Sequence, residues 1–317
     1  MTEQILKPLP AWPGARIGVV SPASSARTDR INRGLEILWS IGYDAVASAH
    51  AFGKHPPYFS GSVEERLADL HSAFADPETR AILCTRGGYG SNYLLDGLDL
   101  DLIRKHPKPF FAYSDMTTVQ TWLLDQIGLV SFHGPMVAGD FSVPDGIHVE
   151  SFRTALTGGL VEAGTYEGLR VLRPGRARGV VYGGCLSILT AALGTPYAPQ
   201  TEGKLLFLED VGTKPYQVDR MLRQMILGGK CEGVRGFIFG EMLNCGSRGA
   251  DADLLQEVIL QVLERYKVPI AIGLRSGHVS GGNVTLPLGI EAELDLESEP
   301  PLLRYLEPAV ASPKHAS

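Results

Sequence analysis

Short apolar runs alternate with segments of helical periodicity along the first half of the chain. In the helical segments apolar residues recur every three or four positions, as Ile31, Leu35 and Leu38 do. Ser62 and Glu65 have the spacing of a capping box that opens a further helix. The apolar runs, which predict strands, span residues 15–21, 43–48, 81–86, 108–113 and 129–132. Strands that alternate with helices predict a mostly parallel sheet with helices on both faces.

The second half is less regular and mixes helical patterns with strand patterns. Helices are predicted at residues 183–193, 218–227 and 251–266, and strands at residues 204–210 and 236–240. From residue 285 to residue 307 apolar and polar residues alternate, as they do in half-buried antiparallel strands. The basic segment Leu172–Arg178, which contains proline and glycine, is the predicted linker. We therefore predict an α/β protein with two domains, residues 1–170 and residues 171–317.

Composition and charge narrow the class of protein. The chain has 317 residues, of which 44% are hydrophobic and 20% charged, so it can bury a sizeable core. Its net charge of -6, without a lysine or arginine block, argues against nucleic acid as a partner. No segment resembles a signal peptide or approaches the roughly 18 apolar residues that span a membrane, so we expect a soluble, cytoplasmic protein. The cysteines are scattered and indicate neither a zinc site nor disulfides: Cys84, Cys185, Cys231 and Cys245.

Two polar features follow predicted strands of the first half. One is the glycine loop at residues 87–90, and the other is Ser114 with Asp115, directly before a predicted helix. Open parallel sheets bind ligands at the C-terminal ends of their strands. There Ser114 would expose its hydroxyl, and the Asp115 N–H with one N–H of the glycine loop would form an oxyanion hole. Taken alone, the glycine loop is more typical of a structural turn and Ser114 of a helix N-cap, and Ser114 lacks the GxSxG pattern.

The second half supplies a carboxylate and an imidazole that would complete such a site. Glu209 and Asp210 end a strongly apolar strand, and at most one of them should enter a given cleft because neighbouring strand residues point to opposite faces. A solvated strand end is the alternative interpretation. Of the eight histidines, His278 follows an apolar segment and is the first candidate for a base. His133 also follows a strand and is interpreted as a pocket-lining or capping residue.

Seven motifs follow one another in the order found in the LD-carboxypeptidases. They are RGGYG (86–90), YSDMT (113–117), HGPM (133–136), GG (183–184), LFLEDVG (206–212), PYQVDRML (215–222) and GH (277–278). The opening GVVSPAS (18–24) is similar to the first strand and loop of that family. Over residues 15 to about 306 the chain thus resembles the muramoyl-tetrapeptide carboxypeptidases, whose relatives include the microcin C immunity proteins.

The resemblance implies a Rossmann-like N-terminal domain that carries a nucleophile. It also implies a smaller, β-rich C-terminal domain that carries the other two members of a Ser-Glu-His triad. Matched motif by motif, Ser114 is the nucleophile, Glu209 the carboxylate and His278 the base. The backbone N–H groups of Asp115 and Gly88 would bind the oxyanion.

The resemblance also implies the reaction and the partners. The reaction is hydrolysis of the L,D peptide bond that releases the C-terminal D-alanine of a murein tetrapeptide in cell-wall recycling. It requires no metal and no cofactor, and the family suggests a homodimer. Arg86 and Arg275 are candidates for binding the terminal carboxylate, although either equally suits a structural salt bridge. Tyr89 and His133 are further candidates for substrate contacts.

Some positions depart from the family pattern, and two other functions stay open. Ala112 stands where glycine is frequent, Cys185 where many members have asparagine, and Thr213 where an acidic residue is expected. These departures bear on the substrate more than on the chemistry. One alternative is a hydrolase of the microcin-immunity type that cleaves aminoacyl or peptidyl nucleotides. The other is a non-catalytic α/β protein whose glycine loop binds a small anion.

Overall fold

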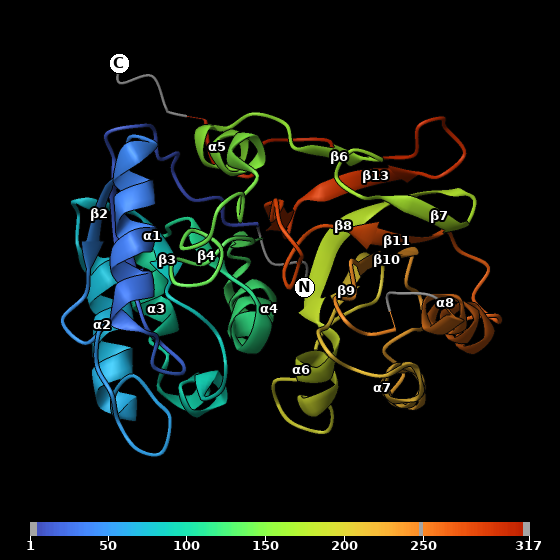
Figure 1. Ribbon diagram of the computed structural model, residues 1–317, viewed down its shortest axis with the longest axis horizontal. Helices are drawn as coiled ribbons and strands as arrows, with labels where there is room; N and C mark the ends of the chain where they lie inside the picture. Colours follow the sequence, from blue (N-terminus) through green and yellow to red (C-terminus); the bar gives the residue numbers. More distant parts are fainter. Residues whose placement is uncertain (1–4, 247–249, 313–317) are drawn as a thin grey trace.

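The computed structural model describes residues 5–246 and 250–312 and contains two β-sheets (Figure 1). The first half of the chain, coloured blue to green, surrounds one sheet, and the second half, coloured yellow to red, surrounds the other. Helices and strands alternate around the first sheet, whose strands are mostly parallel. This arrangement confirms the predicted fold class.

The first sheet has six strands in the order β12-β5-β4-β3-β1-β2. All neighbouring strands pair in parallel except β12, which pairs antiparallel with β5. The strands are β1 (Arg16–Val20), β2 (Asp44–Ala47), β3 (Thr79–Cys84), β4 (Phe110–Ala112), β5 (Ser131–His133) and β12 (Leu286–Leu288).

The helices of the first half connect these strands. They are α1 (Thr28–Ser40), α2 (Val63–Ala75), α3 (Leu100–Lys105), α4 (Thr117–Ile127), α5 (Val149–Thr157) and the 3₁₀ turns η1 (Ser91–Tyr93), η2 (Leu95–Gly97) and η3 (Ser114–Met116). The capping box predicted for α2 is present, because the Glu65 N–H donates to Ser62 Oγ at 3.2 Å and the Ser62 N–H donates to the Glu65 carboxylate at 2.8 Å. These two bonds satisfy N–H groups that a helix start leaves without intrahelical partners.

Side chains of the first sheet enter two separate cores. Val19 of β1 packs in a cluster with Leu35 of α1, whereas the next residue, Val20, packs in a cluster with Leu70 of α2. Successive strand residues point to opposite faces, so these clusters lie on the two faces of the sheet. The helices therefore cover both faces, as the alternating pattern predicts.

The second sheet has eight strands in the order β6-β14-β13-β8-β9-β10-β11-β7. The central strands β8 to β11 run parallel, and the outer strands pair antiparallel. Its strands and helices are β6 (Glu162–Gly164), β7 (Arg170–Arg173), β8 (Arg176–Cys185), α6 (Leu186–Ala191), β9 (Lys204–Glu209), α7 (Pro215–Leu227), β10 (Gly236–Gly240), α8 (Ala250–Val262), β11 (Ile270–Leu274), β13 (Glu291–Asp295) and β14 (Leu302–Tyr305). Across residues 5–246 and 250–312, no helix combines the length and the apolar character needed to cross a membrane.

The predicted linker Leu172–Arg178 is wrong, because this segment belongs to the second sheet. It contains the end of β7 and the start of β8, with a turn between them. The basic side chains that suggested a linker are paired on the sheet surface: Arg176 with Asp295 at 3.1 Å, and Arg178 with Glu291 at 2.8 Å. A charged turn between strands has the same composition as a linker, so the sequence pattern did not separate the two.

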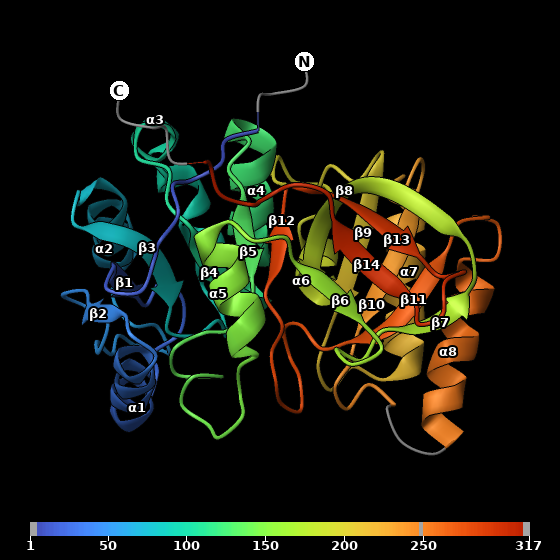
Figure 2. The ribbon, with the colours of Figure 1, turned by 90° about the horizontal axis from the view of Figure 1, so that it is seen from above.

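The predicted helix at residues 183–193 begins later than expected. Gly183 to Cys185 complete β8, and the helix starts at Leu186. Two short strands also lie across the predicted boundary at residue 170. β6 precedes that boundary and joins the second sheet, whereas β12 follows it and pairs with β5 of the first sheet (Figure 2). The division into domains 1–170 and 171–317 stays a prediction.

Candidate active site

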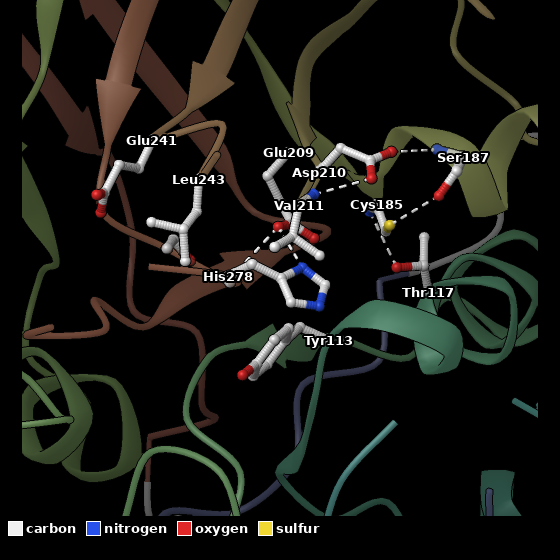
Figure 3. A network of polar contacts seen from close by, with 12 residues as sticks. Tyr113, Thr117, Cys185, Ser187, Glu209, Asp210, Val211, Glu241, Leu243 and His278 are labelled. Carbon is white, nitrogen blue, oxygen red and sulfur yellow. Dashed lines mark hydrogen bonds and ion pairs between the residues drawn. The ribbon is translucent and has the colours of Figure 1, made fainter. Parts of the chain in front are cut away.

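The residues with candidate chemistry follow the C-terminal ends of parallel strands in both sheets. β3 and β4 are neighbours in the first sheet and lead to the glycine loop and to Ser114. In the second sheet β9 ends at Glu209, and β11 leads to His278. Strand ends of the two sheets therefore bring these side chains together, and Figure 3 shows His278 between Glu209 and Tyr113.

Ser114 lies at a sharp turn between β4 and α4. It is the first residue of η3 and has a backbone φ of 62°, in the left-handed region. That conformation costs a non-glycine residue about 1–3 kcal/mol, so the surrounding structure must impose it. Ala112 before the turn and Met116 after it are both fully buried and hold the turn from its two sides. Strain of this kind, held by packing, is typical of functional turns.

Gly87 lets the glycine loop approach Ser114 closely. A methyl group on Gly87 would lie 2.9 Å from Ser114 Cβ, 3.1 Å from Ser114 Oγ and 3.0 Å from the amide nitrogen of Asp115. The missing side chain thus keeps clear the space in front of the predicted oxyanion donor. Gly88, the other predicted donor, lines the same cavity as Ser114.

The Asp115 carboxylate binds the neighbouring 3₁₀ turn. The Ser91 N–H donates to Asp115 Oδ2 at 2.8 Å, and Ser91 Oγ donates to the Asp115 carbonyl oxygen at 2.6 Å. Burial raises the pKa of Asp115 above the usual range of an aspartate. These bonds fix the backbone that carries the Asp115 N–H.

Glu209 holds His278 through two hydrogen bonds. Its Oε2 atom lies 2.8 Å from His278 Nδ1 and accepts the His278 backbone N–H at 3.0 Å. The Glu209 side chain has no exposed surface, whereas the His278 side chain is 20% exposed. Burial acts to raise the pKa of Glu209, but the adjacent imidazoles outweigh it and lower this pKa. Burial likewise acts to lower the pKa of His278, but Glu209 outweighs it and raises that pKa.

A second imidazole lies against the same carboxylate. His133 Nε2 is 3.8 Å from Glu209 Oε1, and His133 Nδ1 is 3.0 Å from Ser276 Oγ. Gly277 leaves room for this contact: it has a φ of +91°, and a methyl group there would lie 2.7 Å from both Glu209 Cδ and His133 Cε1. His133 is fully buried and does not line the cavity that contains Ser114, so its contact with substrate stays a prediction.

Tyr113 forms the opposite side of the His278 environment. The two rings meet edge to face, with centroids 5.0 Å apart and planes at 87°. The Tyr113 hydroxyl is 3.4 Å from Asp140 Oδ1, and Asn283 donates to the same oxygen at 3.0 Å. Burial raises the pKa of Asp140 to about 6. The imidazole is thus held between a carboxylate and an aromatic ring.

Ser114 and His278 line one cavity of about 270 Å³. Gly88, Tyr113 and Arg86 also line it, as do two arginines not predicted from the sequence, Arg27 and Arg30. Both missed residues follow β1, so the rule that placed the glycine loop at a strand end would also have found them.

The other predicted substrate-binding residues lie around different cavities. Arg275 lines a cavity of about 430 Å³ together with Arg170 and Glu241. Tyr89 lines one of about 510 Å³ together with Tyr197. The structure therefore groups Arg86 with Ser114 and His278, and places Arg275 and Tyr89 elsewhere.

Asp210, next to Glu209, has a structural role on the other face of the strand. Its Oδ2 accepts the Ser187 N–H of α6 at 2.8 Å, and its Oδ1 accepts the Thr213 hydroxyl at 2.9 Å. Only one of the two neighbouring carboxylates thus binds His278. Thr213, the position expected to be acidic, holds this loop.

Comparison with known proteins identifies the family of the chain. The profile of the LD-carboxypeptidase N-terminal domain matches residues 17–134, and that of the C-terminal domain matches residues 178–294. The probable murein peptide carboxypeptidase of Bacillus subtilis is 38% identical over 91% of this chain and 91% of its own. The murein tetrapeptide carboxypeptidase of Pseudomonas aeruginosa is 31% identical over 88% of this chain and 93% of its own.

A solved structure with the same fold is the microcin C7 self-immunity protein MccF in complex with aspartyl sulfamoyl adenosine. It superposes with a TM-score of 0.84 and is 28% identical, over 96% of this chain and 100% of its own. The matching profiles and the carboxypeptidase names of these relatives place the chain among the peptidases, a class of hydrolases. The chain belongs to the LD-carboxypeptidase family.

Proposed function

We propose that this protein is a serine-type LD-carboxypeptidase. It hydrolyses the L,D peptide bond of a murein tetrapeptide and releases the C-terminal D-alanine. The observation that supports this most is the shared cavity: Ser114, at a strained turn, lines it with His278, whose Nδ1 is bound by the buried Glu209. A hydroxyl, an imidazole and a carboxylate in this order are the parts of a nucleophilic triad.

The proposed reaction proceeds through an acyl-enzyme. Ser114 Oγ forms a bond to the carbonyl carbon while His278 takes the hydroxyl proton. The tetrahedral intermediate then breaks its C–N bond, and His278 gives the proton to the amine of D-alanine. Water attacks the resulting ester with His278 again as base, and Ser114 regains its proton as the acid product leaves. Glu209 holds the imidazole tautomer, and a positioned base of this kind contributes roughly 10²–10⁴-fold to the rate.

The charge of the cavity supports an exopeptidase. A C-terminal residue carries a free carboxylate, and Arg27, Arg30 and Arg86 all line the cavity that contains Ser114. Arg27 already pairs with Asp29 at 2.7 Å, which leaves Arg30 and Arg86 as the preferred partners for the substrate. An arginine can bind both oxygens of a carboxylate at once. We further expect a cytoplasmic homodimer, which sedimentation velocity and cell fractionation would check.

A second candidate function is hydrolysis of an aminoacyl or peptidyl nucleotide, as in microcin immunity. The fold shared with MccF, whose complex contains aspartyl sulfamoyl adenosine, favours it. Such a ligand needs an aromatic surface for its base. The aromatic residue in the cavity of Ser114 is Tyr113, which is 7% exposed and packs edge-on to His278. This environment offers a base little stacking surface, so the peptide substrate is preferred.

The test compares the parent with Ser114→Ala on a purified murein tetrapeptide, with D-alanine release followed by mass spectrometry. We expect the variant to lose at least about 10³-fold in kcat, because removal of a triad member leaves only the residual catalysis of binding and the oxyanion hole. Ser72→Ala, at an exposed position of α2, is the matched control. If Ser114→Ala and the parent hydrolyse the tetrapeptide at equal rates, Ser114 is not the nucleophile. An aminoacyl sulfamoyl adenylate cleaved in place of the tetrapeptide would select the second function.

A further inference from the structure

A sulfur, a nitrogen and an oxygen ligand meet beside the proposed triad. Cys185, Glu209 and His278 each offer one ligand atom, and these atoms lie within 4.8 Å of one another. We propose that these three side chains bind a zinc ion, and that the bound ion inhibits the enzyme. The inhibitory part rests on the proposed function, because it assumes that His278 is the catalytic base.

The sequence does not reveal this cluster, because its members come from three separate strands. Cys185 is the last residue of β8, Glu209 the last residue of the neighbouring strand β9, and His278 follows β11. Cys185 and Glu209 are paired in register across the two parallel strands. Figure 3 shows the side chains of Cys185, Glu209 and His278 close to one another.

Two hydrogen bonds hold Cys185, one through its backbone and one through its side chain. Its N–H donates to Thr117 Oγ1 at 3.1 Å, and its Sγ lies 3.3 Å from Ser187 Oγ. A ligand held in this way does not have to be ordered when the metal binds, which reduces the entropic cost of binding. The contact of the sulfur with Ser187 Oγ would be given up if the Cys185 side chain turned toward His278.

The separations suit a small tetrahedral ion after a modest closure. Zinc binds sulfur at about 2.3 Å and nitrogen or oxygen at about 2.0–2.2 Å, so its ligand atoms lie roughly 3.3–3.8 Å apart. The upper limit of 4.8 Å in the cluster exceeds this by about one ångström. A turn of the Cys185 side chain and a shift of the His278 ring can supply that difference. The 20% exposed face of His278 gives the ion a route from solvent.

The donor set selects the class of metal. Thiolate, imidazole and carboxylate together suit zinc, whereas magnesium and calcium prefer oxygen ligands alone. Three protein ligands leave a fourth position for water from the cavity. Binding releases the thiol proton of Cys185, because a coordinated thiol is deprotonated. The ion would engage both His278 and Glu209, so the imidazole could no longer act as a base for Ser114.

Cobalt(II) is the first probe, since it takes zinc sites and its bond to a thiolate has a visible and ultraviolet absorption. The protein is freed of metal with a chelator and titrated with cobalt(II), and zinc affinity is then measured by competition. We expect one equivalent to bind the parent with thiolate absorption. Cys185→Ser and Cys185→Ala should lose that absorption and weaken zinc binding by at least about 10–100-fold, the loss known for outer-shell partners alone.

Cys231→Ser is the matched control, because Cys231 is also a buried free cysteine but lies outside this cluster. It should bind the metal as the parent does. Ser114→Ala should also bind at the parent's affinity, which tests the metal site independently of hydrolysis. Absence of thiolate absorption in the parent, or equal zinc affinity in parent and both Cys185 variants, would overturn the site.

The second measurement is hydrolysis of the tetrapeptide with added zinc, each variant being compared with its own metal-free rate. Zinc should inhibit the parent, a chelator should restore it, and magnesium at the same concentration should have no effect. The Cys185 variants should require at least roughly ten times more zinc for the same inhibition. Full activity of the parent with zinc bound would overturn the inhibitory role. Metal binding by a protein that hydrolyses nothing would instead count against the proposed function alone.

Discussion

At the scale of single residues, the charge of Glu209 sets the proton affinity of His278. The pKa of His278 is raised despite burial, because Glu209 Oε2 lies 2.8 Å from Nδ1. A base acts in its neutral form, so kcat/KM should fall as the pH drops through a value above about 6.5, the usual histidine pKa. Glu209→Gln removes the negative charge, so the pH at which kcat/KM falls on the acid side should move to a lower value. It should also reduce kcat by about 10³–10⁴-fold.

The control for this prediction is Glu293→Gln, which removes an exposed carboxylate paired with Arg304. Its pH profile should match that of the parent. If kcat/KM of Glu209→Gln falls at the same acid pH as that of the parent, a group other than His278 is responsible for the fall.

The residues of the site were predictable to different degrees. Ser114, Glu209 and His278 came from motifs, and the structure brings Glu209 against His278 and places His278 in one cavity with Ser114. Contacts across the chain were not predictable, because they depend on packing between distant segments. The burial of His133 against Glu209 is one example, since its sequence context shows only that it follows a strand.

At the scale of elements, the turn after β3 determines the space next to Ser114. Gly87→Ala would place a methyl group 3.0 Å from the Asp115 amide nitrogen and 3.1 Å from Ser114 Oγ. This atom would occupy the space in front of the predicted oxyanion donor, and loss of one such donor costs about 2.7–4 kcal/mol. We therefore expect kcat to fall by about 10²–10³-fold.

The matched control for this prediction is Gly281→Ala, because a methyl group there meets only the Asp145 carbonyl oxygen, at 3.4 Å. It should retain the kcat of the parent. A Gly87→Ala enzyme with the parent's kcat and a normal fold would show that the space beside Ser114 is not used by the substrate.

Periodicity predicted most elements of the first half, and it failed where tertiary pairing decides the structure. The end of β7 and the start of β8 have the composition of a linker, yet they form strands because β11 and β13 offer them partners. Likewise, the glycines that end β8 were assigned to a helix, because a strand that ends directly in a helix has no break in its apolar pattern. Local sequence carries no information about such partners.

At the scale of the whole molecule, a buried polar contact joins helix α4 of the first half to strand β8 of the second sheet. The Tyr182 hydroxyl of β8 donates to Asp125 Oδ2 of α4 at 2.8 Å and accepts the Gln200 N–H at 3.0 Å. Burial raises the pKa of Asp125 to about 6, although the Tyr182 hydroxyl acts against this rise. In the unfolded chain an aspartate titrates near 3.9. The folded protein therefore binds this proton more tightly than the unfolded chain does.

The free energy of unfolding should consequently fall as the pH rises from about 4 to about 6, where the folded state holds the proton and the unfolded chain has released it. Asp125→Asn cannot titrate and should remove about 1–3 kcal/mol of this dependence. Urea unfolding at several pH values gives the free energy of unfolding of parent and variant. The difference between their pH dependences is the contribution of Asp125. That difference excludes Asp140, whose pKa is also about 6 and which is present in both proteins. Parallel pH dependences in parent and Asp125→Asn would contradict the prediction.

Tyr182→Phe tests the cause of the shift by the opposite change. It removes the hydroxyl that stabilises the Asp125 carboxylate, so burial acts unopposed and the pKa of Asp125 should rise further. The pH dependence should then extend to higher pH than in the parent, whereas in Asp125→Asn it disappears. If the pH dependence of unfolding disappears in Asp125→Asn but extends to higher pH in Tyr182→Phe, it comes from the hydrogen bond between these two residues. A general loss of stability would change the pH dependence of both variants in the same direction.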